Sequence, residues 1–78
     1  MEIHTNAKHL VEMYGEKLVG LTVDTPALGE WPGGVSKIIA VAPDPAAPEI
    51  VFNVEHEEHG RIGVFEHEMV TLNPEERK

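Results

Sequence analysis

Two histidines and two glutamates stand side by side in the segment His56-Glu57-Glu58-His59. Imidazole nitrogens and carboxylate oxygens are ligands that zinc and related divalent ions accept. Histidines three residues apart meet on one face of a helix, but this segment is a predicted hairpin tip, where only an irregular turn would bring the rings together. His67 lies too far along the returning strand to complete a site within one chain. We therefore interpret the tip as a polar turn, keep His56 and His59 as weak metal candidates, and predict no cofactor.

Trp31, the only tryptophan, is the stronger candidate for binding. It is surrounded by Gly29, Pro32, Gly33 and Gly34, so its aromatic face could stay open to a small molecule or a protein partner. The alternative is that the indole folds down and plugs one end of the domain. The sequence leaves both interpretations open.

The sequence offers few candidate nucleophiles for covalent catalysis, because Ser36 is the only serine and cysteine is absent. The 14 Asp and Glu residues make many accidental carboxylate pairs, so no single pair indicates acid and base chemistry. The lack of cysteine also excludes disulfides and thiolate zinc sites. We expect a binding protein rather than an enzyme.

The formal net charge of −8 opposes phosphate binding, which depends on cations that displace counterions. We therefore expect no nucleic-acid partner. No apolar run of about 18 residues could form a membrane helix, and the start of the chain lacks the order of a signal peptide. We expect a cytoplasmic protein with no membrane partner. A single domain of 78 residues has a small core, which favours stabilisation by association.

A short helix is predicted over residues 6–14, capped by Asn6 or Thr5 and ended by Gly15, because four apolar residues recur at helical spacing: Ala7, Leu10, Val11 and Tyr14. So short a helix must dock its apolar stripe. We expect it to cover an open end of its own domain; the alternative is that it packs on a neighbouring subunit.

Strand signals follow over residues 17–24, 35–41, 50–65 and 70–72. A loop rich in glycine and proline separates the first two, and three prolines between 43 and 48 predict a rigid, exposed connection. A tight turn at Glu68-Met69 is expected before the last strand, and residues 73–78 form a polar tail. These elements predict one mainly β domain, a small barrel of about five strands over residues 17–72.

The register of the hairpin follows from pairing Glu55 with Arg61, a favourable opposite-charge pair. One face of the hairpin then holds two apolar pairs, Val54 with Ile62 and Phe52 with Val64. The opposite face holds Val51, Asn53, Gly63 and Phe65. A domain this small cannot bury both faces, so we expect the second face to contact another copy. The alternative is that the helix or the Trp31 loop covers it.

The order of strand, long loop, strand, hairpin, one-turn connection and short strand resembles the SH3-like barrels. It is most similar to the plasmid- and integron-borne trimethoprim-insensitive dihydrofolate reductases. The similarity lies in Trp31-Pro32-Gly33-Gly34-Val35, Phe52-Asn53-Val54-Glu55 and Ile62-Gly63-Val64-Phe65. It covers about residues 17–72 and implies a scaffold more than a function.

The resemblance does not extend to the family's catalytic residues. Those enzymes bind folate and nicotinamide in the pore of a tetramer, with a Val-Gln-Ile-Tyr run. Here Gly63 and Phe65 stand in place of the glutamine and the tyrosine, and the family's lysines have no counterpart near Asp24 and Thr25. The resemblance therefore implies an oligomeric habit and a mobile-element setting, but speaks against reductase activity.

Taken together, the sequence predicts a self-associating binding module of the SH3-like type, a dimer or a tetramer, with a small molecule or a protein as its possible ligand. The alternative function is a small-molecule enzyme whose site forms at a symmetric oligomer interface.

Overall fold

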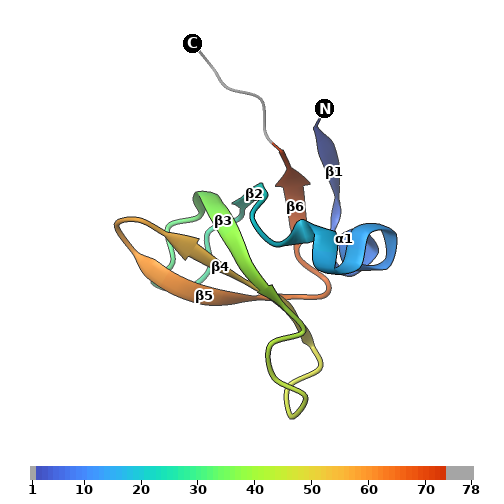
Figure 1. Ribbon diagram of the computed structural model, residues 1–78. Coiled ribbons are helices and arrows are strands. Elements are labelled where there is room, and N and C mark those ends of the chain that lie inside the picture. The colour runs from blue at the N-terminus through green and yellow to red at the C-terminus, as the bar shows by residue number, and fades with distance from the viewer. Residues whose placement is uncertain (1, 74–78) are drawn as a thin grey trace.

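Six strands form one antiparallel sheet in the computed structural model, which describes residues 2–73 (Figure 1). The strands pair in the order β1-β6-β2-β3-β4-β5, so β1 and β5 are the two edges of the sheet. In chain order the elements are β1 (Ile3–Asn6), α1 (Ala7–Tyr14), the 3-10 helix η1 (Gly15–Leu18), β2 (Thr22–Thr25), β3 (Gly34–Val41), β4 (Ile50–His56), β5 (Gly60–Phe65) and β6 (Met69–Leu72).

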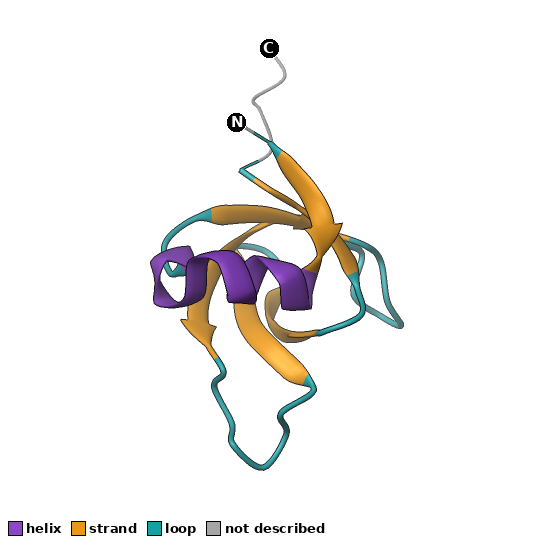
Figure 2. Cartoon of the chain, turned by 90° about the vertical axis from the view of Figure 1, so that its right-hand side faces the viewer, coloured by secondary structure: helices purple, strands orange, loops and turns teal. Residues whose placement is uncertain are grey.

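The helix α1 forms where the apolar spacing and the caps predicted it. The Asn6 side chain accepts a hydrogen bond from the His9 amide at 2.8 Å, and Gly15 ends the helix with a φ of 54°. Ala7 and Leu10 are completely buried, so the apolar stripe docks within the chain. Figure 2 shows the helix lying across the strands. The amides of Ala7 and Lys8 bond the carbonyls of Glu68 and Glu66, which ties the start of the helix to the turn between β5 and β6.

The strand β1 was not predicted, which raises the number of strands from the expected five to six. It pairs with β6 in a register that sets Ile3 opposite Leu72 and Thr5 opposite Val70. His4 joins the pairing through a 2.8 Å contact between its Nδ1 and the Thr71 hydroxyl. The segment is short and half polar, so its sequence gives no strand signal. It becomes a strand because it pairs with the edge of β6.

The predicted strand over residues 17–24 is wrong in its first half. Residues 15–18 form η1 instead, and the strand begins only at Thr22. Leu18 is completely buried whereas Val19 is 45% exposed, so the alternation assumed for a strand fails here. Tertiary packing explains the difference, because the 3-10 turn directs Leu18 into the core that α1 also covers.

The hairpin of β4 and β5 has the predicted register. Glu55 lies opposite Arg61, and the core face holds the predicted pairs, Val54 with Ile62 and Phe52 with Val64. Phe52, Val54 and Val64 are buried, together with Val23 and Ile38 of the neighbouring strands. The core therefore lies inside the curl of the sheet, closed on one side by α1.

The connections differ in how well they follow the predictions. The proline-rich segment 42–49 is a mostly exposed loop that projects from the sheet in Figure 1. The last tight turn spans Phe65 to Glu68, where the Glu68 amide bonds the Phe65 carbonyl at 3.1 Å, rather than the predicted Glu68-Met69. Of the predicted tail, only Asn73 belongs to the described residues. Within residues 2–73, no helix is long and apolar enough to span a membrane.

Candidate functional site

Trp31 fills the end of the curled sheet and is only 7% exposed. The loop between β2 and β3 turns it inward, because the backbones of Leu28 and Trp31 bond each other at 2.8 and 2.9 Å. The indole Nε1 donates a hydrogen bond to the Thr25 hydroxyl at 3.0 Å, which satisfies the buried N–H. Of the two interpretations of Trp31, the structure agrees with the second, in which the indole folds into the domain. An open aromatic platform would need this side chain to leave the core.

Gly33 is the residue that makes this tight loop possible. Its φ is 80°, and a Cβ at this position would lie 2.7 Å from the Thr25 carbonyl oxygen and 2.8 Å from the Ala27 nitrogen. Backbone atoms cannot yield to such a contact, so only glycine fits here. The glycines around Trp31 therefore serve to fold the loop inward, and not to leave the indole open.

The hairpin tip is an irregular turn of the kind that brings the rings of His56 and His59 together. Their ring centroids lie 4.5 Å from each other, and the indole of Trp31 meets them edge-on at 6.1 and 6.3 Å. The turn that allows this closes at Gly60, which has a φ of 84°. The Nδ1 of His56 accepts a hydrogen bond from the Glu58 amide at 3.0 Å, which leaves Nε2 as its free ring nitrogen.

Among the described residues, no further metal ligand is arranged beside the two imidazoles. Over residues 2–73, no three His, Asp or Glu side chains are arranged to hold a metal ion. His67 is occupied elsewhere, since its ring stacks on Phe65 with a centroid distance of 6.0 Å. The tip is therefore a packed aromatic cap over Trp31 in this structure.

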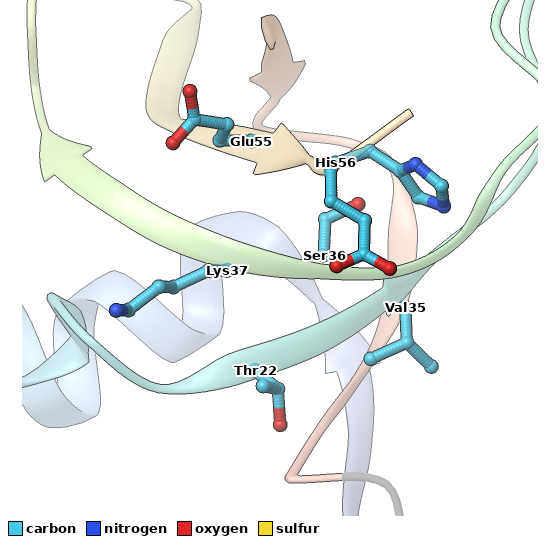
Figure 3. Close-up of a pocket in the computed structure, with 7 residues that line it drawn as sticks. Thr22, Val35, Ser36, Lys37, Glu55 and His56 are labelled. Atoms are coloured by element: carbon cyan, nitrogen blue, oxygen red, sulfur yellow. The ribbon is translucent and has the colours of Figure 1, made fainter. Parts of the chain in front are cut away.

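An open pocket of about 350 Å³ adjoins this cap, and Figure 3 shows the side chains that reach it from β2, β3 and β4. Three of these side chains form a row across the strands, because Thr22 pairs with Lys37 and Lys37 pairs with Glu55. The lining residues are Thr22, Val35, Ser36, Lys37, Glu55, His56 and Glu57. Sequence reasoning missed this pocket, because its residues come from three strands and only the pairing brings them together.

Ser36 is the buried polar residue of this pocket. The side chain is 4% exposed, and its hydroxyl has no hydrogen-bond partner among residues 2–73. Such a group is a rarity in a folded protein, because an unsatisfied buried hydroxyl costs free energy. Its position follows from the register, which sets Ser36 opposite the core residue Val23.

The outer side of the hairpin carries three of the four residues predicted for a contact surface. Asn53 pairs with Gly63, and Phe65 lies next along the same face; all three are half-buried. Val51 is the exception, because the pairing shifts between Ile50 and Phe52 and Val51 packs against the core. We call Ile50, Asn53, Gly63 and Phe65 the outer hairpin face.

Ile50 takes the place that the sequence assigned to Val51. Its side chain lies over Gly63, with Cγ2 2.7 Å from where a Cβ of residue 63 would be. A bulge cannot be deduced from the alternation of apolar and polar residues, which explains why the sequence placed Val51 on this face.

Comparisons of the chain with protein-family models, with curated proteins and with solved structures find no match.

Proposed function

We propose that this protein is a self-associating interaction module whose strands β2 to β6 have an SH3-like arrangement. The support for the arrangement is the pairing order β6-β2-β3-β4-β5 and the sequence of connections, which are a long loop, a projecting loop, a hairpin and a one-turn link. The strand β1 and the helix α1 are additions that precede this unit. The two edge strands β1 and β5 do not pair with each other, so the sheet is not closed into a barrel. The free edge of β5 is the basis of the proposed self-association.

The observation that carries the proposal is that β5 is an edge strand with a half-buried apolar face beside it. Unpaired backbone groups along an edge bind another strand unless the protein covers them. The end of β5 is covered, because the Phe65 amide donates to the Glu68 carboxylate at 3.0 Å. Gly63 and Arg61 lie two and four residues before Phe65 on β5. Because every second residue of a strand directs its backbone groups to the same side, the N–H and C=O groups of Arg61 and Gly63 are also directed to the free edge.

A second copy is the partner that fits this edge. Arg61 lies near the start of β5 with a side chain that is 70% exposed, and Glu66 follows its end. When two copies pair antiparallel about Gly63, Arg61 of each copy lies beside Phe65 and Glu66 of the other. This arrangement sets a guanidinium by an aromatic ring and by a carboxylate twice, once at each end. Arg61 also bonds Glu55 of its own chain at 3.2 Å, so each guanidinium is shared between the two copies, and the net charge of −8 opposes pairing.

Reductase activity is not part of the proposal. Gly63 and Phe65 stand where the reductases that this chain resembles have their glutamine and tyrosine. The Ile50 side chain also covers Gly63. The same exchange makes this face apolar, which suits a contact surface better than a polar reaction site.

The proposal is tested by following backbone amide shifts during dilution from millimolar to micromolar protein. We expect the amide of Gly63, which bonds the second copy, and the nearby amide of Arg61 to shift with concentration, whereas the amide of Ile38 in the central strand β3 stays constant. Shifts confined to other surfaces, or no shifts, would overturn the assignment of the interface to β5.

A further inference from the structure

We infer that the pocket lined by Thr22, Lys37 and Glu57 binds a small zwitterion of the free α-amino acid class. The pocket measures about 350 Å³, which is within the range of small-molecule sites. Its lining residues lie on β2, β3, β4 and the turn after β4, and none of them belongs to the outer hairpin face, so the inference does not rest on self-association.

Two unpaired opposite charges line this pocket. Lys37 and Glu57 are both exposed, and neither has an ion-pair partner within residues 2–73. Glu55, the other carboxylate of the pocket, is bonded to Arg61 at 3.2 Å. The pocket therefore offers one ammonium and one carboxylate that are free to receive a ligand, and their charges cancel.

This charge pattern selects against simple ions. A plain anion that approaches Lys37 also meets Glu57, and a plain cation that approaches Glu57 also meets Lys37. A zwitterion avoids both conflicts, because its carboxylate pairs with Lys37 while its ammonium pairs with Glu57. Hydrogen bonds between charged groups are also stronger than those between neutral ones.

The remaining lining residues favour an amino acid with a small side chain. Val35 is 50% exposed and offers an apolar contact. The Thr22 hydroxyl lies in the row with Lys37 and has no hydrogen-bond partner within the described chain, so it can bond the ligand carboxylate.

The test is a titration of the full chain with L-valine, followed by backbone amide shifts. We expect saturable shifts at Thr22, Val35, Lys37 and Glu57. Acetate and methylammonium, each with only one of the two charges, should bind at least about tenfold more weakly, since each lacks one charge-assisted contact. No saturable shift with L-valine, or equal binding of acetate, would overturn the inference.

Charge-neutral variants locate the site. Lys37→Gln and Glu57→Gln should each weaken the binding of L-valine about tenfold. The matched controls are Lys17→Gln and Glu58→Gln, which change exposed residues outside the pocket lining and should leave the affinity unchanged. If the controls weaken binding as much as the pocket variants do, the binding reflects net charge and the site is wrong. A monomeric protein that still binds L-valine would contradict the proposed self-association and leave this inference intact.

Discussion

The Cγ2 atom of Ile50 lies 2.7 Å from the position that a Cβ atom on Gly63 would occupy. The two residues belong to neighbouring strands, and a shift in pairing next to Ile50 brings its side chain over the glycine. This contact fixes the shape of the outer hairpin face, because any side chain at residue 63 must displace Ile50 or Asn53.

We therefore expect Gly63→Ala to destabilise the fold by about 1–3 kcal/mol through overpacking. The measurement is chemical denaturation of the two single variants and of the double variant Ile50→Ala with Gly63→Ala. The double variant should regain part of the loss, because Ile50→Ala removes Cγ2 from the contact. Strict additivity of the two single effects would mean that the contact does not carry the strain.

The hydrogen bond from Trp31 to Thr25 holds the plug in place. Thr25→Val leaves the buried indole N–H without an acceptor and should cost about 1–3 kcal/mol, whereas Thr25→Ser keeps the hydroxyl and should cost less. Unfolding monitored by Trp31 fluorescence gives both values. The control is Thr22→Val, an exposed position on the same strand, which we expect to change stability by less than about 0.5 kcal/mol. Equal losses at the two positions would contradict the role of this bond.

Leu18 and Val19 distinguish the observed 3-10 turn from the strand that the sequence predicted. Because Leu18 is completely buried, Leu18→Ala should destabilise the protein by about 2–5 kcal/mol. Val19 is 45% exposed, so Val19→Ala should have an effect below about 0.5 kcal/mol. Thermal unfolding of the two variants checks this order, and the reverse order would restore the predicted strand.

The sequence predicted those elements whose signals are local. The helix was found from its caps, and the hairpin register from the pairing of Glu55 with Arg61, which bond at 3.2 Å. It failed where packing with distant segments decides the structure. The strand β1 depends on the edge of β6, and η1 depends on the burial of Leu18.

The residues of the candidate sites were also predicted correctly where local sequence decides their position, and incorrectly where it does not. Gly63 and Phe65 were correctly placed on one face, because alternation along a regular strand is a local property. Val51 was misplaced by a bulge, and the close approach of the tilted His56 and His59 rings depends on the conformation of the turn between them. The pocket at Lys37 could not be found, since its lining depends on the pairing of three strands.

The substitution Phe65→Glu tests self-association because it introduces a charge into the outer hairpin face. Phe65 is half-buried and its ring stacks on His67, so a carboxylate here disfavours close contact with a second copy. Met13→Glu is the control, because Met13 is 44% exposed on α1 and lies outside that face. Circular dichroism of both variants verifies that each still folds.

The central claim is tested most directly by the molar mass of the chain from light scattering at micromolar concentration. We predict a mass of at least twice the 8.6 kDa of one chain for the unchanged protein and for Met13→Glu, and a mass near 8.6 kDa for Phe65→Glu. A monomeric unchanged protein, or a Phe65→Glu variant that keeps the full mass, would contradict it.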